Sequence, residues 1–237
     1  MACFALPVAR ADYAGDLARI HVEAIGGRER VAGLRTMRAT GHVRVGGRVL
    51  RFELIAQRPN CVRITTTDEG RTRVRATDGI TAPWRLDPEK SPVPHQMSGE
   101  EAVEFLADAE FDDQLVNPAG RGYQLDFAGE TTFEGHRALK LLVTHRAEKP
   151  YYLLLDGDTY FIVGRLTTRL LPSGRQVTVE TRYGDFMPVD GILLARRIGI
   201  YTEGRLLDET VLETLTANQP VDEAIFRMPV AEGGAGR

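Results

Sequence analysis

Apolar residues near the start of the chain recur every three or four positions, which is the spacing of one face of an α-helix. The pattern predicts a helix over residues 12–25, ended by Gly26-Gly27, and a second helical turn at residues 29–34. The apolar stripe of the first helix is formed by Tyr13, Leu17, Ile20 and Ala24.

After residue 34 apolar and polar positions alternate, which is the period of a β-strand. Gly46-Gly47 supplies a two-residue hairpin turn between the first two strands. The second strand is expected to place Leu50, Phe52, Leu54 and Ala56 on one face. Strands are predicted at residues 35–45, around residues 50–57, and at 62–66, 71–77 and 80–86. In the fourth of these, Arg71, Arg73 and Arg75 occupy alternate positions and are interpreted as a solvated face.

Three prolines, Pro88, Pro92 and Pro94, exclude regular structure from residues 87–97. The sequence Ser98-Gly99-Glu100-Glu101 then matches a capping box, which predicts a helix to about residue 110. The apolar residues of this mid-chain helix are Val103, Phe105, Leu106 and Ala109.

The second half of the chain reads as a meander of long strands joined by short turns. Strands are predicted at residues 123–129, 138–144, 151–156, 159–169, 176–185, 192–202 and 206–217. Turns this short connect antiparallel strands, because a parallel pair needs a longer crossover. The fold class is therefore mainly β (α+β), with about 11–12 strands in one antiparallel sheet. A twisted sheet of that size curls or splits, and the helices are expected to cover its concave side.

The overall charge is close to balance and excludes a nucleic-acid-binding protein. The 237 residues include 30 basic and 33 acidic side chains, for a formal net charge of −3. A nucleic-acid interface requires a concentrated basic face, which this composition does not provide. We expect a monomer without a nucleic-acid partner.

The two ends of the chain differ in composition from the rest. Residues 1–11 are mostly apolar and end in Ala9-Arg10-Ala11, which matches a signal-peptidase site and predicts the end of a signal peptide on an exported protein. A frayed tail and a lipidation site at Cys3 are the alternatives. Residues 12–229 are expected to form a single domain, and residues 230–237 a disordered tail rich in Gly and Ala.

The sequence shows no arrangement of residues that supports catalysis. None of the five histidines is spaced from another ligand as in a metal site, and no nucleophile elbow or phosphate-binding loop is present. The two cysteines, Cys3 and Cys61, are too few for a disulfide framework or a cysteine-rich metal site. We therefore expect a protein that is not an enzyme and needs neither cofactor nor metal.

One succession of motifs is more specific. Arg58-Pro59-Asn60 ends a strand, and it is followed by the Asp78-Gly79 turn, Trp84 and Asp87-Pro88. Together with the two helices and a closing run from Thr181 to Gly191, this order resembles the LolA/LolB-like family of periplasmic lipoprotein carriers. The resemblance is to the outer-membrane lipoprotein-sorting branch and covers most of residues 12–229. Three features depart from the family pattern, namely the longer C-terminal meander, the single tryptophan and Cys61 after Asn60.

The resemblance implies an unclosed antiparallel half-barrel, located in the periplasm, with helices across its mouth. It also implies that Arg58 bonds carbonyls of a movable lid and controls transfer of the cargo. The strand pattern agrees, since Arg58 follows the even-numbered face of Leu50 and Leu54. The alternative is a surface arginine at a tight turn before Pro59.

The expected ligand site is an apolar cavity covered by the mid-chain helix as a lid, with Arg58, Phe105 and Leu106 as gating residues. The residues expected to line the cavity are Leu50, Phe52, Leu54, Val62, Ile64, Val74 and Trp84. Plain core packing is the alternative interpretation for each of them.

The function that follows is a periplasmic carrier that binds a lipoprotein or lipid acyl chain and moves it toward the outer membrane. Partner proteins in the inner or outer membrane would then supply and receive the cargo. The competing hypothesis is a non-catalytic sensor or scaffold of the same fold that binds a partner protein. Ligand binding with lid movement separates the first hypothesis from the second.

Overall fold

Antiparallel β-structure dominates the computed structural model, which describes residues 9–229 except residues 147 and 172. The hydrogen-bonded order of the strands is β6-β5-β4-β3-β2-β1-β13-β12-β11-β10-β9-β8-β7. In the described part of the chain, β6 and β7 are the two ends of this order, so the sheet is not closed. The expected unclosed antiparallel fold is confirmed, with one strand more than the highest number expected.

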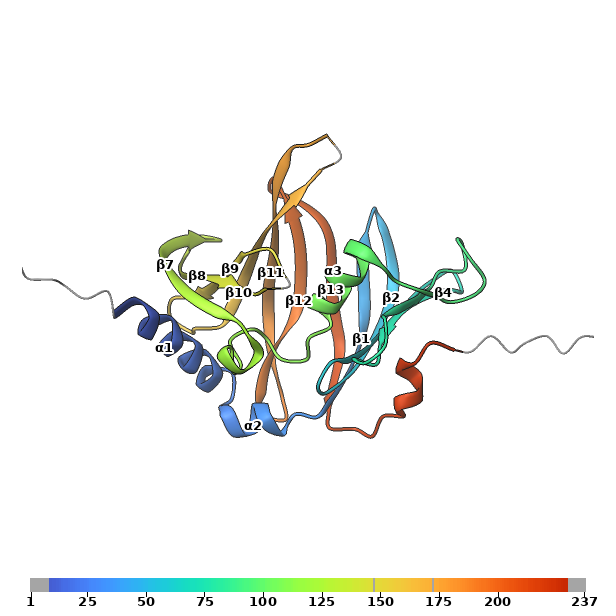
Figure 1. The fold of residues 1–237 in the computed structure, drawn as a ribbon, viewed down its shortest axis with the longest axis horizontal. Helices are drawn as coiled ribbons and strands as arrows, with labels where there is room; N and C mark the ends of the chain where they lie inside the picture. The colour runs from blue at the N-terminus through green and yellow to red at the C-terminus, as the bar shows by residue number, and fades with distance from the viewer. Residues whose placement is uncertain (1–8, 147, 172, 230–237) are drawn as a thin grey trace, which may run out of the picture. The chain divides into compact units, whose positions relative to one another are not determined.

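The elements follow one another closely along the chain (Figure 1). The helices are α1 (Ala9–Ala24), α2 (Arg28–Gly33) and α3 (Gly99–Asp108), with two short 3-10 helices, η1 (Ala119–Arg121) and η2 (Glu223–Phe226). The strands are β1 (Thr36–Val45), β2 (Arg48–Gln57), β3 (Cys61–Asp68), β4 (Arg71–Thr77), β5 (Trp84–Leu86), β6 (His95–Gln96), β7 (Gln124–Phe133), β8 (His136–Thr144), β9 (Tyr151–Asp156), β10 (Ile162–Leu170), β11 (Gln176–Val189), β12 (Ile192–Thr202) and β13 (Arg205–Ala217).

The chain divides into two compact units, and the division falls inside β13. The first unit comprises Met1–Gly33 and Asp112–Val211, and the second comprises Leu34–Phe111 and Leu212–Arg237. The expectation that residues 12–229 form one domain stays a prediction. Residues 1–8 and 230–237, which carry most of the predicted signal peptide and the whole predicted tail, lie outside the described residues; Ala9 to Ala11 belong to α1.

In the first unit, α1 packs beside β7 and against the sheet (Figure 1). The buried face of the helix differs from the predicted stripe, because Tyr13 and Ile20 are exposed. The buried positions are Ala14, Leu17, Ala18, His21 and Ile25. Two of these are alanines, which let the helix backbone approach the sheet closely.

The end of α1 docks onto the turn between β11 and β12. The Leu193 amide donates to the Ile25 carbonyl at 2.7 Å. Gly26 has φ +141°, and a Cβ atom there would lie 2.5 Å from the Gly191 carbonyl oxygen. Only glycine fits this close approach, which explains why the predicted helix end is marked by Gly26.

In the second unit, β1–β5 present two faces that are covered by different elements. Ala56 of β2 stands opposite Val62 of β3, and Val62 stands opposite Thr77 of β4. Residues directly opposite each other in a sheet point to the same side, so this register assigns every side chain to a face. We call the side on which α3 packs the helix face, and the side on which η2 packs the opposite face.

The region around the prolines differs from the prediction in two places. Strand β5 begins at Trp84, and Ile80, predicted at its start, is 90% exposed. Residues 95–96 form a short strand opposite β5, although no regular structure was expected there. The pairing is possible because both residues have an amide N–H, and it continues in the bond of 2.7 Å from the Met97 amide to the Pro83 carbonyl.

Helix α3 begins where the capping box predicted, but without the predicted cap bond. Ser98 has an extended backbone and its side chain makes no cap hydrogen bond. Gly99 follows with φ +60°, in the left-handed region. The glycine therefore sets the entry into the helix, and the predicted bond of the Ser98 hydroxyl is wrong.

Candidate functional site

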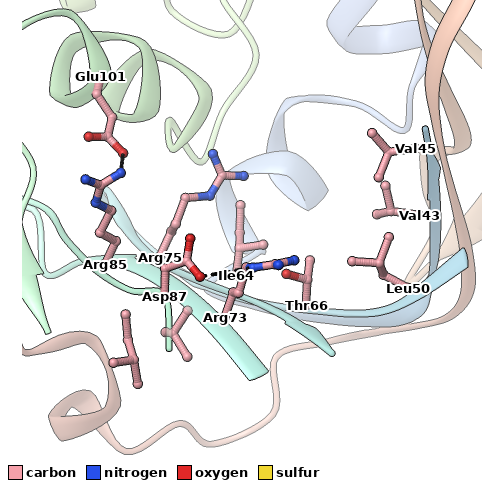
Figure 2. A pocket seen from close by; sticks show the side chains of 12 residues that line it. Val43, Val45, Leu50, Ile64, Thr66, Arg73, Arg75, Arg85, Asp87 and Glu101 are labelled. Carbon is pink, nitrogen blue, oxygen red and sulfur yellow. Dashed lines mark hydrogen bonds and ion pairs between the residues drawn. The ribbon is translucent and has the colours of Figure 1, made fainter. Parts of the chain in front are cut away.

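A pocket of about 290 Å³ opens on the helix face of the second unit (Figure 2). Its apolar end comes from the β1–β2 hairpin and β3, and its charged end comes from β4, β5 and the first turn of α3. The apolar end is lined by Val43, Val45, Leu50 and Ile64, and the charged side chains are Arg73, Arg75, Arg85, Asp87 and Glu101; Thr66, Val74 and Leu86 complete the lining. We call it the helix-face pocket.

Most of the predicted lining residues lie on this face. Leu50 and Ile64 line the pocket directly. Leu54 stands opposite Ile64, and Phe52 stands opposite Thr66, a further residue of the pocket wall. Val62 is buried on the same face and packs with residues of α3. The structure therefore brings Leu50, Phe52, Leu54, Val62 and Ile64 to one side of the sheet.

Trp84 lies on the other side, which corrects its predicted place beside Leu50. It stands opposite Ala76 of β4, which in turn stands opposite Arg63 of β3, an odd-numbered residue of that strand. Trp84 is 1% exposed, and its indole N–H donates to the Phe226 carbonyl at 2.7 Å. The aromatic ring is therefore a core residue beneath η2.

Val74, also predicted to line the cavity, points to the opposite face of the sheet. It borders the pocket, but its side chain packs with Ala76 and Trp84 on the opposite face. The reason is the two-residue period of β4, which turns Val74 away from the side that carries Arg73 and Arg75.

The arginines of β4, predicted as a solvated face, are the part of the site that sequence reasoning missed. Arg73 stands opposite Thr66 and Arg75 opposite Ile64, so both lie on the helix face. Both side chains contribute to the pocket wall (Figure 2). The sequence did contain a signal for this position. Val74 and Ala76 alternate with the arginines and are apolar, so they form the core face of β4, and Arg73 and Arg75 must share the other face.

Two of the three pocket arginines form ion pairs. The Arg73 guanidinium is 3.2 Å from the Asp87 carboxylate and also pairs with Glu89. Arg85 of β5 donates to Glu101 of α3 at 2.8 Å. Arg75 has a different neighbour, with its guanidinium 5.5 Å from the centre of the Phe105 ring.

Helix α3, the predicted lid, fills part of the helix face with its own side chains. Phe105 is buried and packs with Ala56, Val62, Met97 and Ala109. Leu106, predicted as a second gating residue, is 40% exposed. Successive positions on a helix point about 100° apart, so Leu106 lies to the side of the surface that receives Phe105.

Arg58 lies at the other end of β2 from Leu50. Its Nε donates to the Leu34 carbonyl at 2.5 Å, and its guanidinium is 4.8 Å from the centre of the Phe111 ring. Leu34 lies in the short link between α2 and β1, whereas Phe111 follows α3. The carbonyl of Leu34 therefore lies outside the predicted lid helix α3. Arg58 does contact the chain just after α3, through the ring of Phe111.

The Cys61 thiol and clusters of potential metal ligands are the other candidates for chemistry. The Cys61 thiol donates to the Asp78 carbonyl at 3.3 Å, and burial together with the charges of Asp78 and Glu223 raises its pKa, which disfavours the reactive thiolate. Among the described residues, no group of three or more His, Cys, Asp and Glu side chains is arranged to hold a metal ion. Within the same residues, none of the helices has the length and apolar character needed to cross a membrane.

Comparisons with known proteins identify the fold. No family model matches the chain, and no curated protein matches it. Among solved structures, a DUF1329 family protein from Desulfovibrio piger aligns with a TM-score of 0.63 at 15% identity, over 92% of this chain and 97% of the other. An outer-membrane lipoprotein-sorting protein domain from Vibrio parahaemolyticus aligns with a TM-score of 0.63 at 13% identity, over 91% and 97%. The LolA superfamily protein NE2245 from Nitrosomonas europaea gives a TM-score of 0.52 at 12% identity, over 93% and 98%. The chain thus has the LolA-like fold, as the residues around Arg58-Pro59-Asn60 predicted.

Proposed function

We propose that this protein is a non-catalytic periplasmic carrier that binds the acyl moiety of a lipoprotein, or another hydrophobic ligand, for transport to the outer membrane. The observation that carries the proposal is the helix-face pocket, which continues the apolar surface beneath α3. The names of two structures with the same fold, one for lipoprotein sorting and one for the LolA superfamily, point to the same function.

The energetics favour a ligand that displaces the lid. Burying an acyl chain of about sixteen carbons gains on the order of 12 kcal/mol before the costs of binding. Exposing Phe105, the large buried side chain of α3, costs about 2–3 kcal/mol. The gain exceeds the cost of exposing Phe105, so we expect a long acyl chain to extend from the pocket onto the helix face beneath α3.

The pocket is tested by filling it. Val45 lines the pocket and is 41% exposed, so Val45→Trp adds bulk there at little cost to folding. Val49, which stands opposite Arg44 and therefore lies on the opposite face, is 62% exposed and provides a matched control, Val49→Trp. Binding of a dansylated fatty acid is expected to weaken at least about tenfold in Val45→Trp, a loss of about 1.4 kcal/mol, and to stay unchanged in Val49→Trp.

Two outcomes of this experiment count against the carrier. Equal binding of the probe by Val45→Trp and Val49→Trp would show that the ligand does not bind in the helix-face pocket. Failure of the wild-type protein to bind the probe, together with a ligand-free mass after purification from a periplasm, would overturn the proposal and favour a partner-binding module of the same fold.

A further inference from the structure

Among the side chains that line the charged end of the helix-face pocket, the arginines outnumber the carboxylates by one, and Glu89, outside the lining, is a second partner of Arg73. Arg73, Arg75 and Arg85 line it together with two carboxylates, Asp87 and Glu101. Arg75 and Arg85 are directly opposite each other on β4 and β5, so their charges repel. The two lining carboxylates offset this repulsion only in part, because Asp87 pairs with Arg73 and Glu101 pairs with Arg85. Neither carboxylate pairs with Arg75.

Arg75 is the cation left over. Within the residues that the structure describes, no carboxylate oxygen lies within 4.0 Å of its guanidinium. The side chain is exposed and extends away from the strand β4 (Figure 2). Its guanidinium lies over the ring of Phe105. A guanidinium presents several N–H groups in a planar fork that matches the oxygens of a carboxylate or phosphate.

We propose that the ligand of the helix-face pocket is a single-chain amphiphile with an anionic headgroup, a carboxylate or a phosphate. This inference rests on the proposed function. The chain packs against Val43, Val45 and Leu50, and the headgroup binds the Arg75 guanidinium. The volume of about 290 Å³ is at the small end for ligand pockets, which suits one chain better than several.

The headgroup and the lid compete for the same side chain. The Arg75 guanidinium lies over the ring of Phe105, the buried residue of α3. An anion draws the guanidinium toward itself, and the contact with Phe105 is weakened or lost. A neutral headgroup lacks this effect, so the anion adds both affinity and a bias toward opening.

The test compares ligands with identical twelve-carbon chains, each below its critical micelle concentration. Laurate and dodecyl phosphate carry the anion, 1-monolauroylglycerol is neutral, and inorganic phosphate lacks the chain. Each displaces a dansylated fatty acid amide, a neutral probe, from wild type, Arg75→Gln and Arg71→Gln. Arg71 serves as the control because it lies on the same strand and face, pairs with Glu89, and is absent from the pocket lining.

Wild type is expected to bind laurate and dodecyl phosphate about fivefold more tightly than 1-monolauroylglycerol. Arg75→Gln should abolish this preference, so that laurate, dodecyl phosphate and 1-monolauroylglycerol bind within twofold of one another, and Arg71→Gln should retain the preference. The preference should also shrink as the salt concentration rises, because screening weakens exposed charge pairs.

Several results overturn the inference. If 1-monolauroylglycerol binds as tightly as laurate, the pocket selects the chain alone and the carrier proposal survives without the anion. If inorganic phosphate displaces the probe as well as dodecyl phosphate does, the site takes free anions. If no ligand or probe binds, the carrier proposal fails as well, so the two failures are distinguishable.

Discussion

His21 is a buried charged residue in the first unit. Its Nδ1 is 2.8 Å from the Tyr160 carbonyl oxygen, and its Nε2 is 3.2 Å from an Asp113 carboxylate oxygen. Both neighbours only accept hydrogen bonds, so both ring nitrogens carry protons and the imidazole is positively charged. Burial alone lowers the pKa of His21, but the charge and hydrogen bonds of Asp113 and Tyr160 outweigh it and raise the pKa above its ordinary value of 6.5.

This pair makes the stability of the first unit depend on pH. The raised pKa of His21 gives stability that is complete below about pH 6.5 and is lost as the pH rises through the folded-state pKa. The pKa of Asp113 is lowered: burial opposes this, but the charge and hydrogen bond of His21 outweigh it, so its contribution is lost in acid below about pH 3.8. Urea unfolding followed by circular dichroism should show a lower free energy of unfolding at pH 9 than at pH 6.

His21→Gln should flatten this dependence between pH 6 and pH 9 and cost about 2 kcal/mol at pH 6. His42 provides the matched control, because it lies in the second unit and contacts Glu213 on the surface. A pH dependence that persists in His21→Gln would show that another group is responsible.

Arg58 is the second residue whose role is open to a direct test. Its guanidinium lies over the ring of Phe111, which follows the predicted lid helix α3, and its Nε donates a hydrogen bond to the Leu34 carbonyl. If Arg58 biases the lid toward closure, Arg58→Leu keeps much of the packing against Phe111 but loses the charge, and release of a bound fatty acid should accelerate about fivefold. Stopped-flow transfer of a dansylated fatty acid to vesicles measures this rate, and unchanged uptake and release would exclude a gating role.

At the level of elements, the fold followed from the sequence because alternation and turns are local. Residues 71–77 were predicted with the observed bounds, and β9 and β12 likewise. The incorrect predictions concern which face of a strand a side chain occupies, and this depends on segments that are distant in the sequence. The face of β4 that meets the core is decided by its register with β3 and by η2, about 150 residues further along the chain in sequence order. Trp84 was therefore assigned to the cavity, and the place of Arg73 and Arg75 in the pocket wall was not predicted, although Arg75 is exposed as expected.

The short helix η2 should be essential to the second unit because it covers the opposite face. Phe226 is fully buried, and the Ile225 carbonyl accepts a bond of 2.9 Å from Arg63. Phe226→Ala should lower the free energy of unfolding by about 3–5 kcal/mol, since it removes a fully buried ring and leaves a cavity. Fluorescence of Trp84, the single tryptophan, measures both the unfolding midpoint and the expected red shift.

Substitution of a nearby exposed residue gives the comparison. Met228→Ala changes a side chain that is exposed just beyond η2, and its effect should stay within about 0.5 kcal/mol. If Phe226→Ala were equally mild, η2 would be a peripheral segment and the burial of Trp84 would have another cause.

At the level of the whole molecule, each of the two units has its own core. The core of the first unit combines α1 with β8 and β9, and that of the second unit combines α3 with β2 and β3. The helix-face pocket is built wholly from residues of the second unit. A ligand that binds there has its direct contacts in one unit, so the two units should respond to it differently.

Laurate at a concentration of about 100 times its dissociation constant should stabilise the second unit by about 2.7 kcal/mol. Trp84 fluorescence during urea unfolding reports this shift, because the residue belongs to that unit. Amide hydrogen exchange should slow in β2, β3 and β4, whose side chains line the pocket, and stay unchanged in β8 and β9 of the first unit. Exchange in α3 should instead become faster, because the ligand draws Arg75 from Phe105 and loosens the helix. Protection confined to β8 and β9 would place the ligand in the first unit, and slower exchange in α3 would mean that the helix closes over the ligand and is not displaced by it.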